Sequence, residues 1–330
     1  MDNLANKYRP KSWAEVVGQP SIISILSRQV TMKIFKQAYL FVGKAGCGKT
    51  SVARIMANSL NNDCGDIIEI DAASNNGIDS IRALINDAQQ SPIDCDYKVY
   101  VIDECHQLTR AAWDAALKLI EEPPTTAIFI FCTTNPNKIP ETIMSRMQRF
   151  DFKAVDYTTI ADRLEYICNE ELDVVYERVA LERLAIMANG CVRAAIQMLG
   201  QCLDSGNALN LDCVENTLGV VKYDYLMQIS NSIINSDLVA SLNVLNLIKS
   251  TSSNMLQVYD QILEFMVEYL IYIKTNNKNY SKIPNDICEK LVAHRNIEFM
   301  QARLLAFRPN ANDDNSELLL KTILMEVCGN

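Results

Sequence analysis

Eight consecutive residues of this chain have the types and spacing needed to hold a polyphosphate. The stretch from Gly43 to Thr50 fits G-x-x-x-x-G-K-[ST]; it follows an apolar run at 38–42 that predicts a buried strand, and a helical pattern begins at Lys49. Glycines permit a tight turn with several N–H groups directed inward, and a helix N-terminus adds partial positive charge. Lys49 is therefore expected to reach the β- and γ-phosphates, and Thr50 to hold Mg²⁺.

Two carboxylates form the second chemical group. Asp103 and Glu104 end an uninterrupted apolar run at 98–102, which is typical of a central parallel strand covered on both faces. Standing alone, they would be two solvated acids after a strand. Beside a phosphate loop, Asp103 is expected to hold the Mg²⁺ shell and Glu104 to polarise an attacking water. His106 is interpreted as a local hydrogen-bonding residue without a chemical role.

Strand and helix patterns alternate over residues 1–155, which predicts an α/β fold with a parallel sheet flanked by helices. Strands are expected at 38–42, 66–70, 98–102, 127–132 and 150–152, and helices at about 20–31, 49–60, 77–90 and 110–122. Beyond residue 155 the apolar residues recur only at helical spacing. These helical segments are 158–170, 177–189, 192–203, 210–217, 222–234, 236–249, 254–274, 283–294 and 296–306, with polar breaks near 204–209, 250–253, 275–282 and 308–315.

Composition limits the classes of protein to consider. The 330 residues are enough for two or three domains, and no run reaches the roughly 18 apolar residues of a membrane span. Eleven single cysteines without a C-x-x-C pair favour a reducing cytosol over a disulfide framework or a zinc site. Residues 1–155 hold 17 of the 31 Lys+Arg and 17 of the 40 Asp+Glu, so the net charge of −9 falls in residues 156–330.

Four further segments narrow the class, and each also has an ordinary structural interpretation. The arm at 7–19 could close over a nucleotide base or simply pack on the core. Thr134 ends the fourth predicted strand, where polar groups can face a γ-phosphate. Arg146 is either a surface charge or an arginine finger for a neighbouring subunit. Arg193 stands at the start of a predicted helix, where its ordinary interpretation is a helix-capping or salt-bridged arginine.

With these segments in view, the chain resembles the DNA polymerase III gamma/tau clamp-loader ATPases of the AAA+ superfamily, strongly over about residues 4–200 and weakly beyond. The matching stretches are K-Y-R-P-K-S-W-A-E-V-V-G-Q, G-K-A-G-C-G-K-T-S, E-I-D-A-A-S-N-N-G-I-D-S-I-R, V-I-D-E-C-H-Q-L-T, L-I-E-E-P-P, T-T-N-P-N-K-I-P and S-R-M-Q-R-F-D-F-K. The resemblance implies an AAA+ P-loop domain at 1–155, a small helical lid at 156–220 and an all-helical collar at 221–330.

The same resemblance implies a role for individual residues. Asp103 and Thr50 would be the Mg²⁺ ligands and Glu104 the hydrolytic carboxylate. Thr134 and Arg193 would be the two sensors, and Arg146 the finger that completes the next subunit's site. Tyr8, Arg9, Val16 and Val17 would enclose adenine. The loop residues that contact ATP would be Gly43, Lys44, Ala45, Gly46, Cys47, Gly48, Lys49, Thr50 and Ser51.

The implied partners are those of a clamp loader: a sliding clamp, primer–template DNA, and other loader subunits or copies of the same chain in a pentameric spiral. Helices beginning near Asn76 and Thr109 would line the inside of that spiral. Arg82, Thr109 and Arg110 would then follow the duplex backbone without reading bases. ATP and Mg²⁺ are the expected cofactors, no membrane is expected, and the expected location is the cytoplasm.

The chain departs from the family pattern in three ways. The four-cysteine zinc module is replaced by residues 61–68 with Cys64 alone, so no zinc is expected. Met147 stands where the finger motif usually has cysteine. The sequence also ends at 330 without the long tail of cellular relatives, which favours a compact loader, phage-encoded or reduced.

Two other functions compete with the clamp-loader ATPase. One is a catalytically weak structural subunit of the same assembly, which should lack the loop lysine or the Asp-Glu pair. The other is an AAA+ helicase or recombination motor, which should form a hexamer and carry a DNA-binding C-terminal domain, whereas residues 204–330 have the pattern of an acidic helical collar.

Overall fold

The computed structural model describes residues 4–61, 67–92, 95–170, 174–206, 208–249, 255–277, 280–291, 297–306 and 316–328. They divide into two compact units, and the division runs through two helices. The first unit comprises residues 1–172 and 184–200, and the second comprises 173–183 and 201–330.

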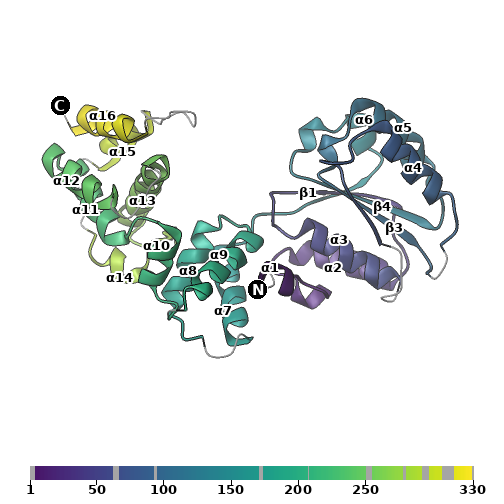
Figure 1. Ribbon diagram of the computed structural model, residues 1–330, viewed down its shortest axis with the longest axis horizontal. Coiled ribbons are helices and arrows are strands. Elements are labelled where there is room, and N and C mark those ends of the chain that lie inside the picture. Colours follow the sequence, from purple (N-terminus) through teal and green to yellow (C-terminus); the bar gives the residue numbers. More distant parts are fainter. Residues whose placement is uncertain are drawn as a thin grey trace. The chain divides into compact units, whose positions relative to one another are not determined.

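A five-stranded parallel sheet is the centre of the first unit (Figure 1). Its strands are β1 (Ala38–Val42), β2 (Ile67–Asp71), β3 (Lys98–Asp103), β4 (Ala127–Thr133) and β5 (Gln148–Asp151), in the spatial order β2-β3-β4-β1-β5. Every residue of β1 and β4 is buried, because both strands are internal and covered on both faces.

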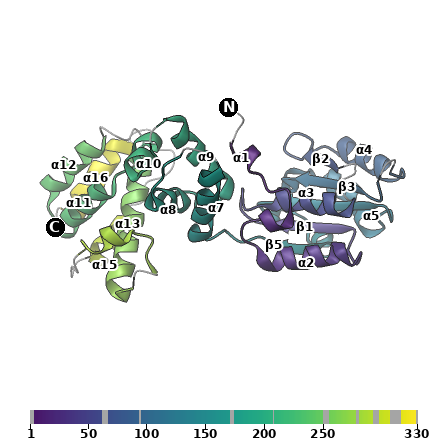
Figure 2. The same cartoon turned by 90° about the horizontal axis from the view of Figure 1, so that it is seen from below.

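Alternate residues of the internal strands build two separate hydrophobic layers, as the two-residue period of a strand requires. Tyr39 and Phe41 pack with α3, whereas Leu40 packs with the helices of the opposite layer. Helices α2 (Pro20–Thr31) and α3 (Lys49–Leu60) cover one face; α4 (Ile78–Ala88), α5 (Arg110–Glu121) and α6 (Glu141–Met144) cover the other (Figures 1 and 2). The sheet is thus fixed between two helical layers.

Shorter and later elements complete this unit. They are α1 (Leu4–Lys7), the 3₁₀ turns η1 (Trp13–Glu15), η2 (Cys105–Gln107) and η3 (Pro136–Lys138), the helix α7 (Tyr157–Glu170), the end of α8 (Arg178–Met187) and the beginning of α9 (Val192–Asp204). Gln19 anchors the N-terminal arm, because its amide donates to the carbonyl of Lys153 (2.6 Å) and accepts from the Lys153 N–H (3.1 Å).

The second unit is helical. Its elements after α9 are α10 (Leu211–Leu218), α11 (Tyr223–Ile234), α12 (Leu238–Lys249), α13 (Met255–Thr275), α14 (Asn285–Cys288), α15 (Ile297–Ala306) and α16 (Ser316–Cys328). Helices α11, α12, α13, α15 and α16 share one hydrophobic core. The predicted α/β P-loop domain followed by many helices is confirmed; the domain boundaries at 155 and 220 stay predictions.

Individual elements differ from expectation where the sequence pattern is weak. The helix predicted at 283–294 covers only Asn285–Cys288, since short-range hydrogen bonds at Lys290 and Leu291 replace the helical ladder there; residues 292–294 lie outside the described residues. Helix α16 was not predicted. Its Leu318 and Met325 are more than half exposed, so apolar residues lie around the helix and blur its period.

Candidate nucleotide-binding site

The strand order brings the chemical groups to one edge of the sheet. Strand β4 pairs with β1 on one side and with β3 on the other, and all three run parallel. Their carboxyl ends therefore meet, with the P-loop after β1, Asp103 at the end of β3 and Thr133 at the end of β4. In open α/β sheets this edge is where ligands bind.

Glycine conformation shapes the P-loop that joins β1 to α3. Gly48 is the N-cap of α3 and has a φ of 103°, and Gly46 has a φ of 69°. Residues that carry a side chain rarely adopt these backbone angles. A Cβ atom at Gly46 would lie 2.1 Å from Cys191 Sγ, so the loop also needs glycine there for close packing against the residues before α9. Lys49 is 5% exposed, and its ammonium donates to the carbonyls of Gly43 (2.8 Å) and Lys44 (3.0 Å).

Thr50 and Asp103 meet across the site. The Thr50 hydroxyl donates to Asp103 Oδ2 at 2.8 Å, and Asp103 Oδ1 accepts the N–H of Glu104 at 2.9 Å. A hydroxyl and a carboxylate beside a phosphate loop are the hard oxygen ligands that Mg²⁺ takes together with substrate phosphates. The donor set at this point fits the predicted magnesium ion.

Glu104 follows β3 and has an unusual backbone conformation. Its φ of 45° and ψ of 40° put a non-glycine residue in the left-handed region. Its Oε2 accepts from the Thr134 hydroxyl at 2.9 Å and lies 3.2 Å from His106 Nδ1. The two predicted groups Glu104 and Thr134 are thus in direct contact, and His106, interpreted above as a local hydrogen-bonding residue, joins them.

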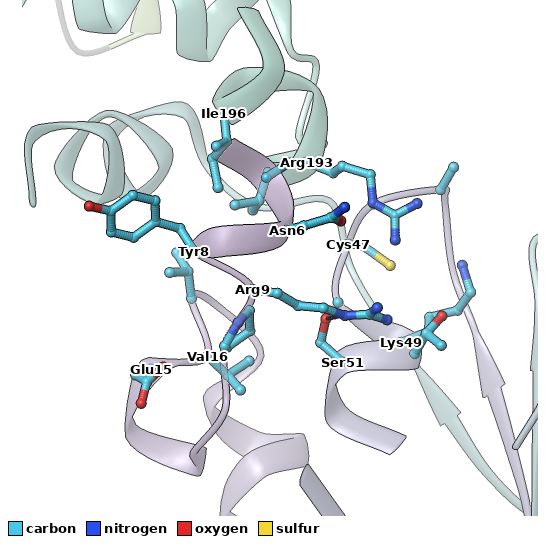
Figure 3. A pocket seen from close by; sticks show the side chains of 18 of the residues that line it. Asn6, Tyr8, Arg9, Glu15, Val16, Cys47, Lys49, Ser51, Arg193 and Ile196 are labelled. Carbon is cyan, nitrogen blue, oxygen red and sulfur yellow. Dashed lines mark hydrogen bonds between the residues drawn. The ribbon is translucent and has the colours of Figure 1, made fainter. Parts of the chain in front are cut away.

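A pocket lies over the P-loop, and residues far apart in the sequence line it (Figure 3). The lining residues predicted from the sequence are Tyr8, Arg9, Val16, Val17, Ala45, Gly46, Cys47, Gly48, Lys49, Thr50, Ser51, Asp103, Glu104 and Arg193. The N-terminal arm supplies the aliphatic side, and the Arg9 Nε donates to the Ser51 hydroxyl at 3.3 Å. The arm and the P-loop therefore form one concave surface with apolar and cationic parts.

Cationic side chains from four parts of the chain line this pocket. Figure 3 shows Arg9 and Arg193 extending toward the P-loop, where Lys49 lies. Arg163 of α7 also lines the pocket and donates to the carbonyl of Tyr8 at 3.2 Å. Burial lowers the pKa of Arg9, and the charges of Arg54 and Arg193 lower it further, yet an arginine stays cationic at neutral pH. The pocket therefore suits a polyanion.

The other predicted functional residues lie outside this pocket. Arg146 is exposed, and its Nε donates to Glu121 Oε1 at 2.7 Å while its guanidinium also bonds to the Thr142 carbonyl. Arg82 and Arg110 are exposed on α4 and α5, and Arg82 lies 3.6 Å from Asp79. The Thr109 N–H donates to the Asn76 carbonyl at 3.1 Å, so the starts of α4 and α5 are adjacent.

Sequence reasoning missed several residues of the site. Arg163, Asn6 and Ile196 line the pocket, and Gln19 ties the arm to the chain after β5. An arginine within an amphipathic helix, or an asparagine in a terminal arm, has no spacing pattern that sets it apart from surface residues. Arg163 and Ile196 are identified only because α7 and α9 pack beside the P-loop in this unit, and Asn6 only because the N-terminal arm does.

The fold and the site together define a P-loop domain of the AAA+ type, and comparison with solved structures supports the fold. The Holliday junction branch migration motor RuvB of Thermotoga maritima superposes with a TM-score of 0.54 at 21% identity, covering 69% of this chain and 79% of that one. At this identity the similarity concerns the fold alone.

Sequence relatives define the family. DNA polymerase III subunit gamma of Buchnera aphidicola subsp. Baizongia pistaciae is 31% identical over 315 residues, which cover 87% of this chain and 85% of that protein. The tau subunit of Bacillus subtilis is 36% identical over 292 residues, 82% of this chain and 52% of that protein. A family profile described as DNA polymerase III, delta subunit, matches residues 61–156. The chain belongs to the DNA polymerase III gamma/tau family, and it spans about half the length of the Bacillus relative.

Two further observations concern metals and membranes. Within the part of the chain that the structure describes, no three His, Cys, Asp or Glu side chains gather as a metal-binding cluster, and Cys64 lies outside that part. None of the described helices is long and apolar enough to cross a bilayer.

Proposed function

We propose that this chain is an ATPase subunit of a DNA sliding-clamp loader. ATP binding would drive the opening of a ring-shaped clamp and its placement on primer–template DNA, and hydrolysis would release it. The observation that carries this proposal is the meeting of Lys49, the Thr50–Asp103 pair and Glu104 beside one pocket, in a chain of the gamma/tau family.

Each group would have a separate task. Lys49 would exchange its loop carbonyl partners for the phosphates, and Thr50 and Asp103 would hold Mg²⁺, which neutralises phosphate charge when bound. Glu104 would orient and polarise the attacking water. Val16, Val17 and Tyr8 would enclose the adenine, while Arg193 would reach the phosphates from α9. Thr134, next to Glu104, would sense the γ-phosphate.

A pentameric spiral, with other subunits or copies of this chain, would complete the site and bind the substrate. Arg146 lies outside the pocket of its own chain, as a finger for a neighbouring subunit must. The starts of α4 and α5, with Arg82, Thr109 and Arg110, are the proposed DNA-backbone contacts; helix N-termini and short side chains can hold phosphates without a large net charge.

Two alternative functions predict different behaviour toward ATP and DNA. A catalytically weak structural subunit would show no appreciable ATP turnover. Such a subunit is expected to lack the loop lysine or the Asp-Glu pair, whereas Lys49, Asp103 and Glu104 are all present. An AAA+ helicase or recombination motor would act on DNA without a clamp. The similarity to RuvB concerns the fold and does not favour the motor.

Substitution of two pocket residues tests the proposal. Lys49→Ala is expected to abolish ATP binding, since it removes the cation facing the phosphates. Glu104→Gln is expected to keep ATP affinity within about twofold and to lower turnover by about 10²-fold or more, trapping the subunit on clamp and DNA. The measurements are nucleotide affinity by fluorescence and hydrolysis with clamp and primed DNA, with Glu122→Gln, an exposed carboxylate at the end of α5, as the matched control. Hydrolysis by Glu104→Gln at the parent rate would refute the assigned base.

A further inference from the structure

The environment of Glu104 contains one group to which the proposed mechanism gives no task. His106 follows in η2, and its side chain is only 9% exposed, against 34% for Glu104. Nδ1 lies 3.2 Å from Glu104 Oε2 and 3.1 Å from Thr133 Oγ1. Thr133 is fully buried at the end of β4, and its Oγ1 also accepts the N–H of Asn135 at 3.0 Å. The imidazole thus connects Glu104 to a rigid internal strand.

The two ring nitrogens of His106 have different partners. The Gln107 side-chain Nε2 lies 3.2 Å from His106 Nε2. A carboxylate oxygen only accepts, so the contact with Glu104 Oε2 requires a hydrogen on Nδ1, and in the neutral ring Nε2 is then the acceptor that faces the Gln107 amide. In that tautomer Nδ1–H points to the Glu104 carboxylate and Thr133 Oγ1. The contact needs no protonated, charged histidine.

The other donor to Glu104 cannot serve two acceptors. Thr134 has one hydroxyl hydrogen, and here it is donated to Glu104 Oε2 at 2.9 Å. If Thr134 donates that hydrogen to a γ-phosphate oxygen, Glu104 loses this bond. His106 Nδ1 is then the side-chain donor that still holds the carboxylate, at the stage when its orientation matters for hydrolysis.

We infer that His106 is a positioning residue for Glu104, holding its carboxylate through Nδ1 while Thr134 turns to the nucleotide. This inference rests on the proposed ATPase function. Since both contacts fall on Oε2, the other carboxylate oxygen remains for the attacking water. His106 touches neither substrate nor metal in this scheme, so its removal should lower turnover and leave nucleotide binding nearly unchanged.

Substitution of His106 by asparagine or by glutamine distinguishes the roles of the two ring nitrogens. In asparagine the amide nitrogen is attached to Cγ, as Nδ1 is in histidine; in glutamine it lies one bond further out, near the position of Nε2. His106→Ala is expected to lower turnover by about 10-fold to 100-fold, the range for losing a hydrogen bond to a charged group, with ATP affinity within about twofold. His106→Asn should restore most of the rate, and His106→Gln should not.

A double substitution tests whether His106 acts through Glu104. With glutamine at position 104, His106→Ala should cause little additional loss, because residues that act as a unit are not additive. The inference is overturned if His106→Ala hydrolyses ATP at the parent rate, if asparagine restores no more than glutamine, or if the full loss persists in the Glu104→Gln background. If the parent chain itself binds ATP and hydrolyses none with clamp and DNA, the proposed function fails instead.

Discussion

At the scale of the residue, Arg146 differs from Glu104 and Arg193, because it does not line the pocket of its own chain. Glu121, at the end of α5, holds its guanidinium by an exposed ion pair of 2.7 Å. An exposed pair of this kind contributes little stability, so the arginine can exchange it for a stronger anionic partner.

Arg146→Ala should therefore leave the ATP affinity of the isolated chain unchanged while lowering turnover in the assembly by about 10³-fold, the scale of an arginine finger acting in trans. Mixing experiments with the parent chain measure which site is impaired: the variant should retain its own site and fail to activate its neighbour's. Arg149→Ala, three residues away and also exposed, is the control. Equal loss in an isolated monomer would place the role of Arg146 within its own subunit.

The residues that sequence reasoning found are those with fixed spacing. Lys49, Thr50, Asp103 and Glu104 belong to local patterns whose chemistry requires their positions, and the structure brings them together. Arg163 and Asn6 were missed as pocket residues, because a single arginine or asparagine has the same local pattern whether it faces solvent or lines a pocket. Their importance depends on contacts between segments, which local spacing does not encode.

At the scale of the element, α4 and α5 begin side by side, since the Thr109 N–H bonds to the Asn76 carbonyl. Thr109 also caps α5, its hydroxyl oxygen accepting the N–H of Ala112 at 3.2 Å. Thr109→Ala should destabilise the start of α5 by about 1 kcal/mol, whereas Thr109→Ser keeps the cap. Faster hydrogen exchange at residues 110–114 in the alanine variant, and not in the serine variant, would be the signature; equal exchange in both would show that the cap contributes nothing.

The same two helices carry the proposed DNA contacts. The double variant Arg82→Ala/Arg110→Ala should weaken binding to unrelated primed templates equally, with ATP binding intact. Because each phosphate contact contributes about one to the log–log salt slope, the slope should fall by about two. Lys118→Ala, exposed in the last turn of α5, is the control on the same helix. An unchanged affinity and slope would remove both arginines from the DNA path.

The bounds of an element could be predicted well where burial requires a regular pattern of apolar residues. The internal strands β1, β3 and β4 are buried on both faces, so their apolar runs match the observed bounds within one residue. The edge strand β5 was predicted at 150–152 and lies at Gln148–Asp151, because an edge position accepts polar residues. Helix α16 is recognisable only through the core that it shares with α11, α12 and α13.

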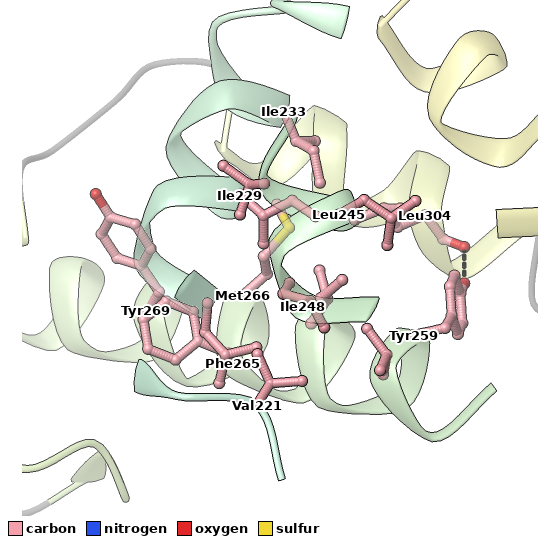
Figure 4. Close-up of a cluster of buried hydrophobic side chains, with 14 of the residues drawn as sticks. Val221, Ile229, Ile233, Leu245, Ile248, Tyr259, Phe265, Met266, Tyr269 and Leu304 are labelled. Carbon is pink, nitrogen blue, oxygen red and sulfur yellow. Dashed lines mark hydrogen bonds between the residues drawn. The ribbon is translucent and has the colours of Figure 1, made fainter. Parts of the chain in front are cut away.

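At the scale of the whole molecule, the second unit has its own hydrophobic core. Figure 4 shows side chains of α11, α12 and α13 packed together, with the Tyr259 hydroxyl donating to the Leu304 carbonyl of α15. The net charge of −9 falls in residues 156–330. This acidic half is poorly suited to DNA, which is consistent with a role in assembly.

Size measurements test the assembly. With a non-hydrolysable ATP analogue, clamp and primed DNA together, the chain is expected in a complex of five loader subunits, either copies of itself or with other subunits. Omission of the analogue should lower the amount of that complex, since Arg146 of one chain would contact nucleotide bound to the next. Light scattering after gel filtration gives the mass. A hexamer on DNA that forms equally without clamp would favour the motor instead.

The left-handed backbone of Glu104 has a consequence for how this position can vary. A non-glycine residue at φ 45° carries an energy of order 1 kcal/mol or more that glycine or asparagine would relieve. Under the proposed ATPase function, mutational drift toward a more stable fold and selection for turnover act in opposite directions at this one residue. A copy of the gene released from the need to hydrolyse ATP would be expected to lose its glutamate here early, and to gain stability as it does so.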